Sequence, residues 1–253
     1  FTGSTGIGKL LYGQSAQTMK KLSLELGGNA PFIVFDDADI DAAIEGAVAS
    51  KYRNSGQTCI CTNRFYVQDG IYDEFARRFT ERVRALKVGN GFEPDVQQGP
   101  LINQAAVEKA EAHIADAKAR GARVLAGGQR SALGSNFFNP TVLADATDNM
   151  LIANEETFGP VAALFRFNTE QDAIAAANAS ELGLAAYFYT RDLSRVFRVS
   201  RALESGMVGI NAGLVTTEVA PFGGVKDSGI GSEGSSHGIE EYLHLKYVSI
   251  GGL

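Results

Sequence analysis

Residues 32–68 read FIVFDDADIDAAIEGAVASKYRNSGQTCICTNRFYVQ, in which two strand-like runs flank a helical segment. The apolar run 32–35 is typical of a buried strand, and apolar residues recur at helical spacing within 39–52. Residues 64–68 again have strand character. A strand, a helix and a strand in this order predict a parallel βαβ unit with a right-handed connection.

The same alternation continues on both sides of this unit. Further helices are expected at 4–16, 71–86, 104–120, 170–179 and 193–203. Strand-like runs stand between or beyond them at 22–26, 124–125, 161–167, 186–190, 207–211 and 244–250. Repeated strand–helix–strand units predict an α/β protein with a mostly parallel sheet.

Two local features carry separate expectations. The stretch Gly27-Gly28-Asn29 is expected to form a turn between the strands on either side of it. The last strand-like run, 244–250, has no obvious partner within the chain. Because an unpaired terminal strand often joins another subunit's sheet, this run predicts a homo-oligomer.

The composition is that of an ordinary soluble globular protein, with 253 residues, 45% hydrophobic and 21% charged. The net charge is -6 and Lys and Arg form no run, which argues against nucleic acid or an anionic membrane as a partner. The two cysteines are too close in sequence for a disulfide framework, so we expect a reducing compartment, the cytoplasm. No membrane-length apolar stretch or signal peptide is visible.

Closely spaced glycines, Gly3 to Gly8, open the first expected helix. Such glycines let backbone N–H groups approach a phosphate, although a plain packing turn explains them equally well. The stretch from Gly3 to Lys9 also fits the G-x-x-x-x-G-K pattern of P-loop nucleotide hydrolases. That pattern requires Ser or Thr next, and Leu10 cannot bind magnesium, so a P-loop is not expected.

Two side chains are candidates for chemistry, although neither proves anything alone. Glu25 ends a strand beside two glycines, where a cleft can form, but most Glu residues near turns are surface residues. Cys59 follows a loop of small residues, so its thiol can be accessible and its backbone N–H free to hold an oxyanion. Most free cysteines are instead buried and inert.

Five motifs occur together in one order: FTGST at 1–5, ELGGN at 25–29, GQTC at 56–59, EETFGP at 155–160 and PFGGVK at 221–226. In this order and at these separations they resemble the aldehyde dehydrogenase superfamily, essentially from Phe1 to Leu253. The resemblance implies the aldehyde dehydrogenase fold, α/β with a mostly parallel catalytic sheet and helices on both faces.

The resemblance also implies a division of the chain. The end of a dinucleotide-binding domain would occupy 1–26, the catalytic domain 27–220, a return to the first domain 221–242 and an oligomerisation strand 243–253. Because the chain begins inside a motif and without an initiator Met, we expect an upstream segment. The family's oxyanion-hole Asn and adenosine-binding residues would lie there, so NAD and NADP both stay open as the cofactor.

Matched by motif, Cys59 resembles the family's nucleophile and Glu25 the base that activates the hydrolytic water. The thiolate adds to the aldehyde, and the thiohemiacetal that forms expels hydride to a positioned nicotinamide. Water then hydrolyses the resulting thioester. Glu25 can deprotonate that water if burial raises its pKa toward neutrality.

The other matched positions concern the dinucleotide. Gly3, Ser4 and Gly8 resemble the turn near the pyrophosphate, with Ser4 as the contact. Glu156 matches the residue that binds the nicotinamide ribose. Phe158 matches the residue that packs beside the nicotinamide, and Leu26 would line the same pocket.

The substrate is expected to be an aldehyde with a carboxylate at its far end. Arg53 lies six residues before Cys59, and a guanidinium pairs bidentately with a carboxylate. An ion-paired surface Arg is the alternative. The stretch 51–61, together with residues 238–243 and 245–247, resembles the succinate-semialdehyde dehydrogenase branch. In that branch the matching Arg binds the substrate carboxylate.

In the same branch a hydroxyl residue near the end helps this Arg, and Thr216 stands where Ser is usual. The extra methyl group narrows the pocket, so glutarate semialdehyde remains a close rival. One methylene is worth only about 1–3 kcal/mol of discrimination.

Cys61 invites a further hypothesis, because some members of the branch form a reversible disulfide between the nucleophile and a Cys two residues later. A Cys-x-Cys bond would be strained and easily reduced, and a passive packing role is the favoured alternative. The three histidines, His113, His237 and His244, are scattered, so they are read as ordinary surface or structural residues and no metal site is expected.

One rival from a different class is that the chain is not an active enzyme. A processed piece or incomplete gene product could fold around residues 30–205 and serve only as a structural or binding module. By resemblance, the assembled protein is expected to be a homo-dimer or homo-tetramer joined through the terminal strand.

Overall fold

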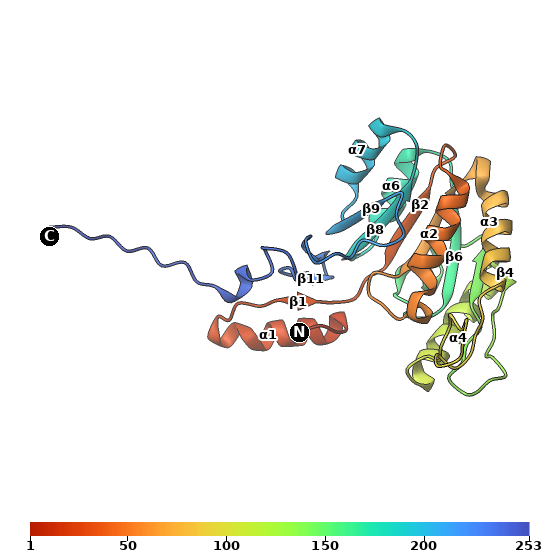
Figure 1. Ribbon diagram of the computed structural model, residues 1–253, viewed down its shortest axis with the longest axis horizontal. Helices are drawn as coiled ribbons and strands as arrows, with labels where there is room; N and C mark the ends of the chain where they lie inside the picture. The colour runs from red at the N-terminus through yellow and green to blue at the C-terminus, as the bar shows by residue number, and fades with distance from the viewer. Residues whose placement is uncertain (253) are drawn as a thin grey trace.

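The computed structural model describes residues 1–252 (Figure 1). Its centre is a seven-stranded sheet in the order β4-β5-β6-β3-β2-β8-β9. Neighbouring strands are parallel except for the antiparallel pair β4 and β5 at one edge. The strands are β2 (Ala30–Val34), β3 (Thr62–Gln68), β4 (Arg123–Ala126), β5 (Thr141–Ala144), β6 (Val161–Phe167), β8 (Ala185–Tyr189) and β9 (Met207–Ile210).

Helices cover both faces of this sheet (Figure 1). Strand residues alternate between two cores: Phe32 and Val34 belong to one, Ile33 and Phe35 to the other. The first core includes α2 (Ile40–Tyr52) and α3 (Asp69–Arg84). The second includes α4 (Gln104–Ala119), α5 (Leu151–Asn154), α6 (Glu170–Asn178) and α7 (Leu193–Ala202). The predicted α/β class, with a mostly parallel sheet, is therefore confirmed.

Smaller elements lie beside the main sheet (Figure 1). The helix α1 (Thr5–Ser15) has Ser4 at its N-cap position, and the Ser4 side chain makes no capping hydrogen bond. The short strand β1 (Leu24–Glu25) pairs antiparallel with β11 (Gly229–Ile230), and β7 (Leu182–Gly183) pairs with β10 (Val225–Lys226). Short 3-10 turns are η1 (Ala16–Thr18), η2 (Arg53–Gly56) and η3 (Glu240–Tyr242).

The expected turn at Gly27-Gly28-Asn29 is wrong. The chain runs on from β1 to β2 without a hydrogen-bonded turn, and β1 and β2 belong to different sheets. Neither Gly27 nor Gly28 has a positive φ. These glycines serve close approach instead of chain reversal, as the site shows below.

The expected strand at 244–250 is also absent from the described residues. Residues 243–252 are exposed and have no strand partner, and Figure 1 shows them leaving the body as an extended tail. A strand needs a neighbour to accept and donate its backbone hydrogen bonds, and within residues 1–252 none lies alongside. Membrane crossing by a helix is not supported, because no helix within 1–252 is both long and apolar enough.

A buried arginine ties the sheet to the segment that follows β1. Arg64 Nε donates to the carbonyl of Asn29 at 3.0 Å, and Arg64 Nη2 donates to the carbonyl of Ala177 at 2.9 Å. The second contact lies at the C-terminal end of α6, where the helix dipole favours a positive charge. Arg64 thereby fixes where the chain enters β2 directly after the ELGGN motif.

Candidate active site

Glu25 is held by backbone bonds and leaves its carboxyl free. Its N–H donates to Phe1 O, and Gly3 N–H donates to Glu25 O, each at 3.0 Å. The side chain is only 2% exposed, yet neither carboxyl oxygen has a hydrogen-bond partner within residues 1–252. Burial raises the pKa of Glu25 to about 7, with a contribution from the charge of Glu233. A carboxyl with this pKa and two free oxygens suits a general base.

Cys59 lies in a tightly folded loop between α2 and β3. Asn54, Ser55 and Gly56 all have positive φ, at 48°, 56° and 75°. Left-handed non-glycine residues are strained, and such strain persists where neighbours fix the loop. Gly56 is fixed in this way, since a Cβ there would lie 2.2 Å from Gly159 O.

The Cys59 thiol is partly buried, and the charges of two carboxyl groups act on it. Burial raises the pKa of this thiol, and the charges of Glu156 and Glu25 add to the rise. Backbone hydrogen bonds from Cys59 and Ile60 oppose it. The same N–H groups can donate to an oxyanion that forms on a carbon bound to the sulfur.

The glycines after Glu25 bring these groups together. A Cβ at Gly28 would lie 2.1 Å from Cys59 O, so only glycine permits the observed approach. Gly28 N–H donates to Glu156 Oε1 at 3.0 Å. The segment 25–28 therefore contacts both the Cys59 loop and the EETFGP motif, and the structure brings Cys59, Glu25 and Glu156 near one another.

Glu156 and Phe158 lie on the segment between α5 and β6. Burial raises the pKa of Glu156 to about 7. Phe158 has φ 53° and leaves 39% of its surface exposed. The two side chains thus offer a carboxyl group and an apolar ring beside the Cys59 loop.

The glycine-rich start of α1, Gly3 to Gly8, contacts the site through Leu26. A Cβ at Gly8 would lie 2.4 Å from Leu26 Cδ2, so Gly8 lets α1 pack directly on that side chain. Gly3 and Ser4 are exposed at the start of α1. Gly8 therefore packs on Leu26 and Gly3 N–H donates to Glu25 O, whereas Ser4 is exposed and makes no side-chain capping bond.

The two predicted substrate-binding residues, Arg53 and Thr216, lie on separate elements and make no hydrogen bond with each other within residues 1–252. Arg53 is exposed at the end of α2, and Thr216 is exposed in the loop after β9. The neighbour of Thr216, Val215, packs against the same core cluster as Cys59. With no such bond between them in the described residues, the joint role of Arg53 and Thr216 stays a prediction.

Cys61 is buried beside the Cys59 loop and contacts Lys51, a residue that the sequence did not single out. Lys51 Nζ donates to Cys61 Sγ at 3.3 Å and to Asn63 Oδ1 at 3.0 Å. Asn63 in turn donates to Asn29 Oδ1 at 3.1 Å. Lys51 lies seven residues after Ile44 on the buried face of α2. This helical spacing is the sequence signal from which the burial of Lys51 could have been predicted.

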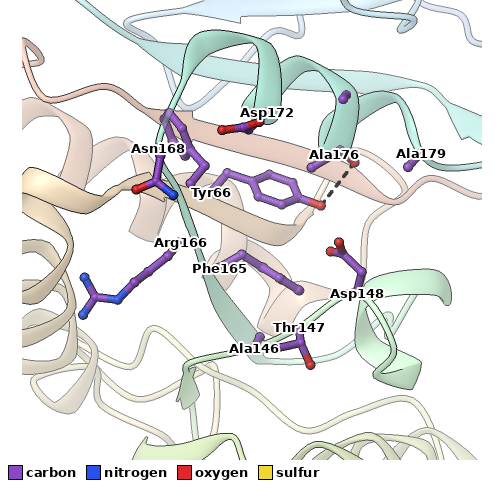
Figure 2. Close-up of a pocket in the computed structure, with 12 residues that line it drawn as sticks. Tyr66, Ala146, Thr147, Asp148, Phe165, Arg166, Asn168, Asp172, Ala176 and Ala179 are labelled. Carbon is purple, nitrogen blue, oxygen red and sulfur yellow. Dashed lines mark hydrogen bonds between the residues drawn. The ribbon is translucent and has the colours of Figure 1, made fainter.

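A separate crevice of about 560 Å³ lies between the end of β6 and α6 (Figure 2). Figure 2 shows Tyr66 inside it, with the Tyr66 hydroxyl donating to Ala176 O at 3.2 Å. Asp148 and Asp172 are also among its lining residues. None of the predicted site residues lines this crevice, so it is distinct from the site around Cys59.

With this geometry established, comparison with known proteins settles the family. The model of the aldehyde dehydrogenase family matches residues 1–248. The chain belongs to the aldehyde dehydrogenase family. The fold agrees, since the crystal structure of a succinate-semialdehyde dehydrogenase from Burkholderia pseudomallei superposes with a TM-score of 0.97 at 62% identity, covering 98% of this chain and 52% of that one.

Three curated relatives of this aldehyde dehydrogenase chain have different names. The chain is 61% identical to a 3-sulfolactaldehyde dehydrogenase of Pseudomonas putida and 60% identical to a glutarate-semialdehyde dehydrogenase of Pseudomonas aeruginosa, each over all of its length. It is 61% identical, over 99% of its length, to the NADP(+) succinate-semialdehyde dehydrogenase of Escherichia coli. The chain covers 52% of each relative, so it spans about half of their length.

Proposed function

We propose that this chain supplies the nucleophile and the general base for oxidation of succinate semialdehyde to succinate with NADP. The observation that carries the proposal is the meeting of Cys59 with a buried carboxyl, Glu25, whose oxygens have no partner within 1–252. A thiol forms the covalent intermediate, and a carboxyl with a pKa near 7 accepts a proton from water.

In the proposed mechanism the Cys59 thiol first loses its proton to solvent water, and the thiolate then attacks the aldehyde carbon and forms a thiohemiacetal. The N–H groups of Cys59 and Ile60 stabilise the oxyanion. After oxidation the product is a thioester on Cys59. Glu25 then takes a proton from water, the resulting hydroxide attacks the thioester carbon, and the acid product leaves as the C–S bond breaks.

Residues of this chain fit a nicotinamide dinucleotide. Ser4 makes no capping bond, so the first-turn N–H groups of α1 are available to a phosphate. Glu156 offers a carboxyl group for ribose hydroxyls, and the exposed ring of Phe158 offers an apolar face. When bound, the dinucleotide supplies the hydride acceptor. NADP is favoured over NAD because the Escherichia coli relative is named for it.

The substrate proposal rests on Arg53. The names of the relatives share one chemical feature, since succinate semialdehyde, glutarate semialdehyde and 3-sulfolactaldehyde all carry an anionic group away from the aldehyde. A guanidinium at Arg53 suits such a group. Glutarate semialdehyde is the second candidate, because a relative at 60% identity is named for it.

Steady-state kinetics test this proposal. We expect kcat/KM for succinate semialdehyde to exceed that for butanal, an uncharged aldehyde of equal length, because only the acid pairs with Arg53. Arg53→Gln should remove most of this preference, at a cost of about 2–3 kcal/mol, while leaving the butanal rate unchanged. Equal kcat/KM for the acid and for butanal in the unsubstituted protein would reject the substrate assignment.

We also propose a division of the chain into units, a mode of assembly and a compartment. Residues 1–26 and 221–242 form part of a dinucleotide-binding unit, which the pairing of β1 with β11 supports. Residues 27–220 form the catalytic unit. The tail from residue 243 joins subunits into a homo-dimer or homo-tetramer. The compartment is the cytoplasm, where Cys59 and Cys61 remain thiols.

A further inference from the structure

A buried histidine with no part in this mechanism lies beneath the EETFGP motif. His113, in α4, is 1% exposed. Its Nδ1 is 3.0 Å from Thr157 Oγ1, and its Nε2 is 3.4 Å from Glu155 Oε2. Nε2 makes no hydrogen bond within the described residues. The two residues that His113 approaches flank Glu156 on either side.

The segment that His113 contacts is confined between α4 and the nucleophile loop. A Cβ at Gly159 would lie 3.9 Å from Ala110 Cβ in α4, and a Cβ at Gly56 would lie 2.2 Å from Gly159 O. Phe158 has a left-handed backbone, which a non-glycine residue keeps only when its neighbours fix it. A small shift at Thr157 therefore moves Glu156 and Phe158 together.

The charge state of His113 suits its two neighbours. Burial lowers the pKa of His113, and the charge of Lys109 acts in the same direction, while Glu155 and Asp116 oppose them. A neutral ring has one N–H and one acceptor nitrogen. With the proton on Nε2, the N–H faces the Glu155 carboxylate and Nδ1 accepts from the Thr157 hydroxyl.

We propose that His113 is a positioning residue for the dinucleotide end of the site. Its bond to Thr157 holds residues 155–158 so that Glu156 and Phe158 face the bound dinucleotide. This inference rests on the function proposed above, and it assigns to α4 a role in cofactor affinity. His113 acts through Thr157 and touches neither substrate nor dinucleotide.

Three substitutions of His113 separate this role from simple core filling. His113→Phe keeps an aromatic ring, one atom larger than imidazole, and removes both nitrogens, whereas His113→Asn places an amide near the position of Nδ1. His113→Gln places its amide near the position of Nε2 instead. Ala115→Asn, on the exposed face of the same helix, is the matched control.

Two measurements follow the variants: the Kd for NADPH by fluorescence titration, and hydrogen exchange at the amides of residues 155–159. We expect His113→Phe to weaken NADPH binding about tenfold, since Thr157 loses its buried partner, and to speed exchange in this segment. His113→Asn should restore most of both properties, His113→Gln should restore neither, and Ala115→Asn should match the unsubstituted protein.

Unchanged Kd and exchange in His113→Phe would overturn the inference. Equal loss in the Phe and Asn variants would also overturn it, because His113 would then only fill the core. If the unsubstituted protein binds no NADPH, the proposed function fails. The exchange data still decide the role of His113, which is supported if protection is lost in the Phe variant and regained in the Asn variant.

Discussion

At the scale of single residues, the site contains two carboxyl groups whose pKa values burial raises to near 7. Glu25 and Glu156 both have pKa values raised to about 7, chiefly by burial. Each therefore changes charge near physiological pH, Glu25 with no hydrogen-bond partner among residues 1–252 and Glu156 with Gly28 N–H as a donor. Both are charged above this pH, where Glu25 is ready to accept a proton.

These raised pKa values predict how stability depends on pH. Between pH about 4.5 and 7 the folded protein holds protons that the unfolded chain has lost, so these groups reduce stability as pH rises. We expect Glu25→Gln to flatten the fall in Tm between about pH 5 and about pH 8. Thermal denaturation of the substituted and unsubstituted protein measures this, with the exposed Glu93→Gln as control. An equal fall in both proteins would contradict the raised pKa of Glu25.

At the scale of elements, the segment between β1 and β2 positions the chemistry. Gly28 lies so close to Cys59 O that any side chain must displace the nucleophile loop. We expect Gly28→Ala to lower kcat/KM by about tenfold to a hundredfold, as small misplacements of reacting groups do. It should also change the rate at which iodoacetamide alkylates Cys59.

Gly91→Ala is the matched control for this prediction, because a Cβ there meets nothing within 4 Å. It should leave both the kinetics and the alkylation rate unchanged. Wild-type kinetics in Gly28→Ala would show that the loop tolerates the added methyl group, and the argument for close approach would fail.

The elements of the main sheet could largely be predicted from the sequence. Apolar alternation specifies buried strands, and β6 at Val161–Phe167 has the predicted bounds. The pairing of β1 with β11 could not be predicted, because Leu24 and Ile230 are far apart in the chain and each strand has only two residues. The sequence predicts a turn at Gly27 and Gly28 because two adjacent glycines are typical of turns. Their actual role, close approach to residues that are distant in the sequence, leaves no local sequence pattern.

The site itself was predictable in part. The ordered motifs selected Cys59, Glu25 and Glu156 as candidates, and the structure places the three near one another, while their roles stay predictions. The sequence did not indicate that Lys51 contacts Cys61, or that His113 contacts Thr157 beside Glu156. A single buried polar residue on an apolar helix face looks the same in sequence whether it braces a site or only the core.

At the scale of the whole molecule, the exposed tail at residues 243–252 is the segment proposed to join subunits. Its apolar side chains are exposed, Leu245 at 104% and Tyr247 at 89%, and it makes no strand within residues 1–252. We expect deletion from residue 244 onward to lower the oligomeric mass in analytical ultracentrifugation. The Tm measured at low protein concentration should not change, because the tail buries no surface within its own chain. An unchanged oligomeric mass after deletion would refute its role in assembly.

The central claim is that Cys59 carries the acyl group and Glu25 releases it. Intact-mass spectrometry after incubation with succinate semialdehyde and NADP tests this claim most directly. We expect Glu25→Gln to accumulate one succinyl group on Cys59, found by peptide mapping, and Cys59→Ala to show neither adduct nor turnover. Steady-state turnover in Cys59→Ala, or a succinyl group that maps to another residue, would contradict the account.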